Sequence, residues 1–458
     1  MNISRRNFLK LGPLAWASLG INLFSPSLFQ RRLLAADLPS DRKLLFIFQN
    51  GGNDGINTVI PSGDPSYNTD SRPSLYIPPA QAIDAGNGFA HLHPALQPMM
   101  EIYNSLSLNG QPGPGNLAVL HRIGYSGQSQ SHFDSQQYWQ NGVPGQSTLE
   151  EGMFYRHLNA TRDLTHADNA FVAAAISSSQ MVALKGDKPF PNFSRAAEFS
   201  FTGSAAKSRK LLGTLPSTPG GADGSGMMGL YGGAADDASK IYRPLVHQTG
   251  QLLGSTMSIL QGAVGMGAYT PENGAVYGND GLGRKLMEAA MLFKRTPVKI
   301  VGMTIGGWDT HTGQGQLTGG HPNLLGQLAR GFQALHRDLQ AQWDKLLIVT
   351  MTEFGRTSEE NGSQGTDHAE SSVVFVAGGG VKGGIYNCDA TTWKSGDMFS
   401  SRNGRYLAKR TDFRGVFGEV FTRHFGDSPD LLDTIIPGYR AAATRDPAGF
   451  APLGFIRS

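Results

Sequence analysis

Five short apolar runs constrain the fold of this 458-residue chain more than any other feature. They are rich in β-branched and aromatic residues and lack polar alternation, which is typical of strands covered on both faces of a parallel sheet. The sequence predicts strands at Leu44–Phe48, Leu117–Leu120, Val298–Met303, Leu346–Thr350 and Val373–Val376.

Apolar residues recur at helical spacing between these runs. The pattern predicts helices over Pro94–Tyr103, Gly281–Lys294 and Leu324–Leu339, and a further one from Ser131 through Trp139. Alternating strands and helices predict an α/β fold with a doubly wound, mostly parallel sheet. Residues 163–279, with a Gly- and Ser-rich middle at Pro216–Ala235, interrupt the alternation and are interpreted as an insertion that covers one end of the sheet.

The N-terminus predicts export. The sequence SRRNFLK at Ser4–Lys10 precedes an apolar run from Leu11 to about Phe29 and a small pair at Ala35-Ala36. This pattern indicates a twin-arginine signal peptide over residues 1–36 and a mature domain over residues 41–458. We expect the twin-arginine (Tat) export machinery to carry the protein to the periplasm or outside the cell. A permanent membrane anchor is the alternative, but glycine and proline in the run argue against a stable span.

Charge, hydropathy and cysteine content limit the classes of partner and the cross-links that the mature chain can have. Of 39 basic residues, five lie in the leader, so the mature chain has 34 against 36 acidic residues. It carries no basic stripe interleaved with aromatics, which argues against nucleic acid, and no later run is long enough to span a bilayer. The single Cys388 forms no internal disulfide, which fits folding in the reducing cytoplasm before export.

Polar clusters lie beside the predicted strands, and sheets of this class bind ligands at the carboxyl ends of their strands. Three clusters follow strands, in NGGNDG, GGWDTH and TEFGR, and a fourth, GTDH, precedes the Val373 strand. Oxygen and nitrogen ligands without thiolate fit a divalent metal such as zinc, manganese, magnesium or calcium. The candidate ligands are Asp54, Asp309, His311, Glu353 and His368.

Each cluster also has an ordinary interpretation. Asp54 fits a simple turn, Asp309 fits a cap on its own backbone, and Glu353 fits a surface ion pair with Arg356. In the metal interpretation, Trp308 walls the site, and Asp367 or Thr366 orients His368 from behind.

Ser131 is the candidate nucleophile. It stands at a predicted helix start, where amides and the helix dipole favour an anion, and a nearby metal lowers the pKa of a hydroxyl. Ser131 and Asp134 equally fit a helix cap. Arg356 or Arg72 is expected to steady an anionic group. The glycine-rich run at Gly378–Gly384 precedes no predicted helix, which argues against a phosphate loop, and His93 is most simply the start of a helix.

The order of motifs resembles one bacterial family over nearly the whole mature chain. These motifs are SRRNFLK, FQNGGNDGINTVIP, HPAL, SHFDSQQYW, GGWDTH, TEFGR, GTDHAE and GGGVKGG. The family is exported by the twin-arginine route and is known as domain of unknown function 1501. It is similar to the alkaline phosphatase and sulfatase superfamily, whose doubly wound sheet commonly holds two divalent metals over a Ser, Thr or formylglycine nucleophile.

The resemblance implies an alkaline phosphatase-like fold and a role for each candidate. Ser131 resembles the nucleophile, and the remaining matches are to metal ligands. These are Asp54 for the first-strand Asp, Asp309 and His311 for the next pair, Glu353 for the Asp of an Asp-His-Gly segment, and His368 for the last His.

This chain departs from the superfamily in two ways. Phe354 stands where the superfamily has His and Glu353 replaces Asp, so one metal loses a nitrogen ligand. The absence of a Cys-x-Pro-x-Arg segment argues against a formylglycine sulfatase. We expect an exported metal-dependent hydrolase of phosphate or related anionic esters. The alternative is a non-catalytic exported binding or assembly protein that keeps the scaffold without its chemistry.

Overall fold

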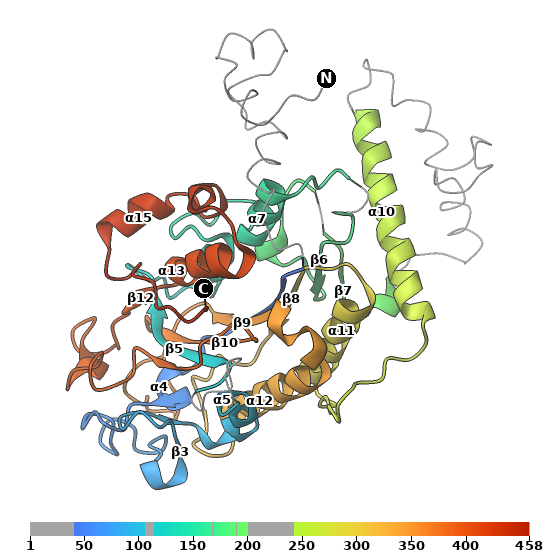
Figure 1. Ribbon diagram of the computed structural model, residues 1–458. Coiled ribbons are helices and arrows are strands. Elements are labelled where there is room, and N and C mark those ends of the chain that lie inside the picture. Colours follow the sequence, from blue (N-terminus) through green and yellow to red (C-terminus); the bar gives the residue numbers. More distant parts are fainter. Residues whose placement is uncertain (1–40, 106–113, 167–168, 189, 200–241, 458) are drawn as a thin grey trace.

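The computed structural model describes residues 41–105, 114–166, 169–188, 190–199 and 242–457 (Figure 1). The predicted signal peptide over residues 1–36 and the Gly- and Ser-rich segment at Pro216–Ala235 lie outside the described residues.

A nine-stranded, mostly parallel sheet forms the centre of the molecule (Figure 1). The strand order is β11-β5-β10-β9-β1-β8-β6-β7, and β12 pairs with β5. The central strand β1 pairs in parallel with β8 on one side and β9 on the other. The bounds are β1 Lys43–Gln49, β5 Leu117–Gly124, β6 Ala173–Ile176, β7 Asn192–Phe193, β8 Ile300–Ile305, β9 Leu346–Thr352, β10 Ser372–Ala377, β11 Gly384–Tyr386 and β12 Thr411–Asp412.

All five predicted strands are confirmed, as β1, β5, β8, β9 and β10. The predicted parallel direction is wrong for β10, which runs antiparallel to both β9 and β5. Two neighbouring parallel strands need a long crossover connection, which is usually a helix. Residues 353–371, which join β9 to β10, contain no helix, so the chain reverses direction between these two strands.

Side chains of β1 alternate between two hydrophobic cores. Leu45 and Ile47 belong to one core, and Leu44, Phe46 and Phe48 belong to the other. Helices therefore cover both faces of the sheet. The first face carries η2 Pro94–Met99, α5 Met100–Tyr103, α10 Tyr242–Gly265, α11 Gly281–Arg295 and α12 Gly320–Asp338; the second carries α6 His132–Asn141, α7 Met153–Thr161, α13 Phe413–Glu419, the π-helix η8 Val420–Phe425, α14 Leu432–Ile435 and α15 Tyr439–Arg445.

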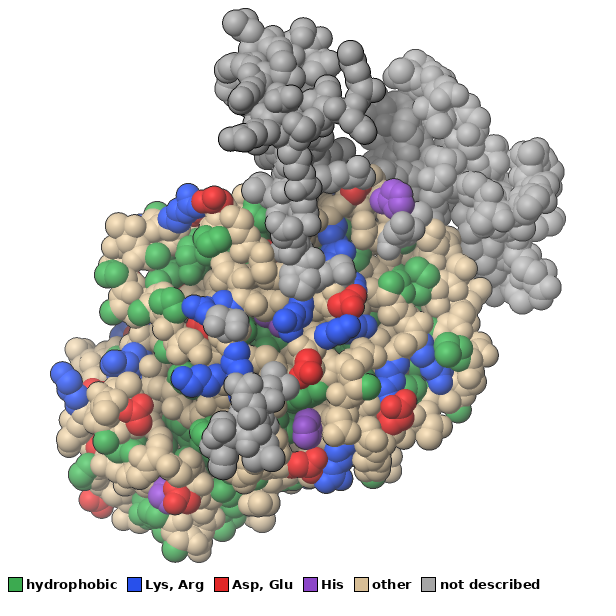
Figure 2. Space-filling view, in the orientation of Figure 1, with side chains coloured by type: hydrophobic (Ala, Val, Ile, Leu, Met, Phe, Trp, Pro, Cys, Tyr) green, Lys and Arg blue, Asp and Glu red, His purple; other side chains and the backbone are tan. Residues whose placement is uncertain are grey.

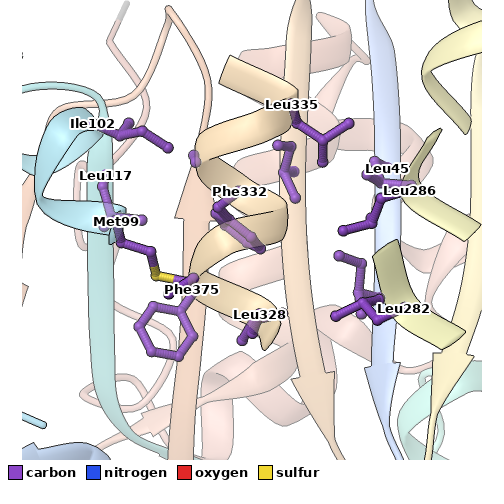
Figure 3. Packing of buried hydrophobic residues seen from close by; sticks show 14 of the residues in the cluster. Leu45, Met99, Ile102, Leu117, Leu282, Leu286, Leu328, Phe332, Leu335 and Phe375 are labelled. Atoms are coloured by element: carbon purple, nitrogen blue, oxygen red, sulfur yellow. The ribbon is translucent and has the colours of Figure 1, made fainter. Parts of the chain in front are cut away.

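The predicted helices form with adjusted ends. In Figure 3, α12 lies over the sheet with Leu328 and Phe332 among the core side chains, and Leu286 of α11 lies beside Leu45. The predicted helix over Pro94–Tyr103 divides into the 3₁₀ turn η2 and the short helix α5. Pro98 has no amide hydrogen and interrupts the α-helical bonding.

The stretch interpreted as an insertion continues the main sheet in its described part. It contains β6 and β7, which extend the sheet beyond β8, and then α10. A small second sheet follows the short helix α4 near the other end of the molecule. The helix α4 spans Gly55–Thr58, and the sheet has three strands in the order β2-β4-β3: β2 Val59–Ile60, β3 Ile83–Asp84 and β4 His91–Leu92.

Within the described residues, no helix has both the length and the apolar character needed to cross a membrane. On the face drawn in Figure 2, basic and acidic side chains are interspersed among polar and apolar surface. The glycine-rich run at Gly378–Gly384 leads from β10 into β11 without a helix, as predicted.

Phe46 provides a test of the core on the second face. Its buried ring lies 4.9 Å from that of Phe154 and 6.3 Å from that of Phe417, measured between centroids. We expect Phe46→Ala to lower the free energy of unfolding by about 3–5 kcal/mol, because it removes apolar contacts and leaves a cavity. Phe133, which is 87% exposed, is the matched control, and Phe133→Ala is expected to change stability by under about 0.5 kcal/mol. Denaturant unfolding followed by circular dichroism measures both; equal losses would contradict the assignment of Phe46 to the core.

Candidate metal centre

Loops from five strands meet at one edge of the sheet. The segments after β1, β5, β8 and β9 leave the carboxyl ends of strands that share one direction. His368 precedes β10, so it reaches this edge because β10 runs in the opposite direction. The antiparallel direction of β10 thus brings the fourth cluster to the other three.

Three imidazole rings surround the carboxylate of Asp309. The Nε2 atoms of His311 and His368 each lie 3.1 Å from Oδ1 of Asp309 and 2.9 Å from each other. Nε2 of His132 lies 3.3 Å from Oδ2 of the same carboxylate. Potential ligand atoms of His132, Asp309 and His368 all lie within 4.8 Å of one another.

The opposite nitrogen of each ring has its own partner. In each histidine, Nδ1 lies 2.9 Å from an oxygen atom. The partner of His132 is Oε1 of Glu353, that of His311 is Oδ1 of Asp367, and that of His368 is the carbonyl oxygen of Gln130. Carboxylates and carbonyls accept hydrogen bonds, so these partners favour a proton on Nδ1. In the neutral rings, Nε2 then carries a lone pair directed toward Asp309.

This convergence requires positive charge. Three nitrogen lone pairs and a carboxylate facing one another repel unless protons or a cation lie between them. Histidine ligands of metals characteristically donate their other N–H to a carboxylate or carbonyl, as all three rings do here. Ligand atoms bound to one ion at about 2.0–2.1 Å lie roughly 3 Å apart, close to the distances at Asp309. The residues present therefore fit a divalent metal.

Arg356 fixes Asp309 and is itself fully buried. Its guanidinium donates to Oδ1 of Asp309 at 2.6 Å and to the carbonyl oxygens of Gly52, Trp308 and Thr366 at 2.9–3.0 Å. Burial acts to raise the pKa of Asp309, but the hydrogen bond and the positive charge of Arg356 lower it to about 2. Arg356, predicted to contact an anionic group, thus uses its donors within the protein and keeps Asp309 ionised.

Asp54 lies in a buried network instead of among the histidines. Arg72 donates to Asp54 Oδ2 at 2.6 Å, and Gln314 donates to the same oxygen at 2.7 Å. Oδ1 caps the helix α4 by accepting from the amides of Ile56 and Asn57. Both carboxylate oxygens of Asp54, a predicted metal ligand, are therefore occupied by protein donors, and the donors of Arg72 are occupied as well.

The network at Asp54 supports the loops that carry the site. Oε1 of Gln314 accepts from the hydroxyls of Thr310 and Thr366 at 2.8 and 2.7 Å. Thr310 precedes His311, and Thr366 precedes Asp367. Asp54 thereby contributes to the position of the site from below.

Glu353 lies behind His132. Its fully buried carboxylate accepts at Oε1 from His132, from the amide of Gly51 at 2.7 Å and from Gln136 at 3.1 Å. The hydrogen bond that His132 donates to the Glu353 carboxylate outweighs burial and raises the pKa of His132. Phe354, next in the chain, packs its ring against His368 and His132 at centroid distances of 4.3 and 4.9 Å. Phe354 thus orients two imidazoles by contact.

Gly51 and Gly52 permit the close approach of the first loop. A Cβ atom on Gly51 would lie 2.2 Å from the amide nitrogen of Asp309, and one on Gly52 would lie 2.7 Å from the ring of Phe354. Both residues have positive φ, at +127° and +88°. Glycine at both positions therefore allows this loop to pass close to the loops that carry Asp309 and Phe354.

The remaining predicted residues have distinct positions. Ser131 is the N-cap of α6, and its hydroxyl accepts from the amide of Asp134 at 3.4 Å. Trp308 is buried in the core on the first face, so it does not wall the centre. Asp367, expected to orient His368, contacts His311 instead, and His93 begins η2 as predicted.

Sequence reasoning overlooked His132 as a potential ligand. It lies in SHFDSQQYW, at the first position of α6 after β5, directly beside the residue chosen as nucleophile. A histidine at a helix start that follows a buried strand was the available signal, because that position faces the carboxyl edge of the sheet.

A family model described as "Protein of unknown function (DUF1501)" matches residues 41–396, which is most of the chain. This chain belongs to the DUF1501 family. The match includes every residue that surrounds Asp309, so the candidate centre lies within the part shared with DUF1501 proteins. No curated protein matches the chain.

Asp54 offers a test of the supporting network. Its pKa is lowered to about 2: burial opposes ionisation, but the charge and hydrogen bonds of Arg72 more than compensate. A lowered folded-state pKa contributes stability above the unfolded value near 4, and this contribution is lost as the pH falls toward 2. We expect the stability advantage of the wild-type protein over Asp54→Asn to shrink by about 2 kcal/mol between pH ~5 and pH ~2. Denaturant unfolding over this pH range measures it; an advantage independent of pH would contradict the assigned ion pair.

Proposed function

We propose that this DUF1501 protein is an exported metal-dependent hydrolase of phosphate or related esters on an alkaline phosphatase-like scaffold. One observation carries the proposal: three imidazoles, each held at Nδ1, direct Nε2 at one ionised carboxylate. The predicted twin-arginine leader supports export to the periplasm or outside the cell.

The contacts support a revised set of ligands. His132, Asp309, His311 and His368 would hold the cation, with His132 in place of Asp54 and Glu353 among the predicted ligands. Glu353, Asp367 and the carbonyl of Gln130 would fix the three rings. A divalent cation held there would act as a Lewis acid toward an ester oxygen and lower the pKa of a nearby hydroxyl.

Solvent access supports a catalytic role. The side chains of Asp309 and His311 are 44% and 41% exposed. Structural metal sites are usually closed by protein ligands, whereas catalytic sites keep a position open for water or substrate. The mixture of nitrogen and carboxylate ligands fits zinc or manganese and leaves the identity of the ion to experiment.

Ser131 remains the proposed nucleophile. It directly precedes His132 and is a partly exposed residue at the start of α6. The hydroxyl only accepts the long bond from Asp134, so the bond leaves its proton available for removal. In this reaction the Ser131 oxygen would bond to phosphorus as the bond to the ester oxygen breaks, and the alcohol would leave with the proton lost by Ser131. Water would then hydrolyse the phosphoserine and release phosphate. The role of Arg356 is to keep Asp309 ionised and in place throughout.

Metal binding is the first test of the proposal. We expect the purified protein to bind a divalent ion, and Asp309→Ala and His368→Ala to abolish that binding because each removes a ligand. Glu353→Gln is expected to weaken it by about 10–100-fold, because the support of His132 is altered. Glu370→Gln is the matched control, since Glu370 contacts Ser401 and Arg402. Elemental analysis and calorimetric titration measure these effects. Wild-type protein that binds no ion, or ligand variants that bind like Glu370→Gln, would refute the centre.

Turnover is the second test. A screen of phosphomonoesters, phosphodiesters and sulfate esters on metal-loaded protein is expected to detect hydrolysis that Ser131→Ala reduces by about a thousandfold or more. Undiminished turnover in Ser131→Ala would remove this residue from the mechanism. Metal binding without hydrolysis of any of these esters would favour the non-catalytic binding protein.

A further inference from the structure

A short hairpin beyond the family match is attached to the metal centre. Ser401 and Tyr406 pair across it as an antiparallel bridge, and Arg402 and Asn403 take positive φ values of 48° and 58° in its turn. The family match ends at residue 396, so this hairpin lies outside it.

Hydrogen bonds on two sides anchor the hairpin to the loops of the centre. The hydroxyl of Tyr406 accepts from the side chain of Gln130 at 2.8 Å, and the carbonyl of Gln130 accepts from His368. On the other side, the amide of Ser358 donates to the carbonyl of Arg405 at 3.2 Å. The preceding Thr357 exchanges hydrogen bonds with the backbone of Asp367. Arg405 is thus held beside the segment that contains Asp367 and His368.

The two arginines of the hairpin differ in their partners. Nε of Arg402 lies 3.1 Å from Oε1 of Glu370. The side chain of Arg405 is exposed, its Cζ lies 5.8 Å from the centroid of the Tyr406 ring, and no carboxylate of the described residues lies within ion-pair distance. Its charge also interacts with Asp367. Arg405 is therefore an available cation at the rim of the centre.

We infer that Arg405 binds the phosphate group of the substrate at this rim, an inference that rests on the proposed function. Arg72 and Arg356 are buried and donate to protein oxygens, so they do not offer free donors to an anion. A guanidinium presents two parallel N–H donors that match phosphate oxygens. Arg405 combines this chemistry with solvent access, and the Tyr406 ring steadies its position.

Binding of inorganic phosphate tests the inference in the full chain loaded with its divalent ion. Calorimetric titration compares the wild type with Arg405→Gln, Arg405→Lys and the matched control Arg402→Gln. We expect Arg405→Gln to weaken phosphate binding about 10–100-fold with unchanged affinity for the ion, because it removes charge-assisted hydrogen bonds. Arg405→Lys is expected to weaken phosphate binding less, and Arg402→Gln to leave it near the wild-type value.

Several results would overturn the inference. Phosphate affinity in Arg405→Gln equal to that in Arg402→Gln would exclude a specific contact. A parallel loss of ion affinity in Arg405→Gln would show that Arg405 acts through Asp367 and His311. Wild-type protein that binds the ion but no phosphate would refute the inference and leave the metal centre intact. Failure to bind any ion would instead refute the proposed function on which it rests.

Discussion

The loops at the carboxyl ends of the strands depend on the hydrogen bonds of one buried side chain, the guanidinium of Arg356. It joins the backbone after β1, through Gly52, to that after β8, through Trp308, and to the segment before β10, through Thr366. The same guanidinium also donates to the carboxylate of Asp309, around which the imidazoles gather. A buried cation is unfavourable without such partners, so its burial forces these loops to keep their carbonyls and Asp309 in place. The same requirement leaves room only for glycine at Gly51 and Gly52, whose backbones pass directly beneath Asp309 and Phe354.

A second buried pair supports the edge from below. Arg72 and Asp54 neutralise each other, and Gln314 carries hydrogen bonds from Asp54 to Thr310 and Thr366. The two arginines therefore act at different depths: one holds the carboxylate of the centre, and the other holds the loops on either side of it. Both arginines bind only protein oxygens, so both can be buried although the site above them is partly open to solvent.

The sequence was sufficient for the main features of the fold. Continuous apolar runs identified five strands, because a strand buried on both faces is apolar at every position. Helical spacing of apolar residues identified α11 and α12, because each of these helices buries one face. The direction of β10 leaves no such pattern, since a buried strand is equally apolar in either direction. The clustering of the candidate residues was predicted in part for a similar reason. Asp309, His311 and His368 come together as predicted, but Asp54 and Glu353 were not distinguished from them. In a sequence, a carboxylate in a turn looks the same whether it faces an open site or a buried partner. Only the folded positions of Arg72 beside Asp54 and of His132 beside Glu353 show that these two carboxylates face protein partners.

The partial exposure of Asp309 and His311 has a consequence for how an ion would be acquired. An ion held at an open edge exchanges with the surrounding solution without unfolding of the chain, in contrast to one enclosed by four protein ligands. Occupancy would then follow the supply of ions in the compartment where the protein resides, because selectivity among such metals depends on availability as well as on ligand type.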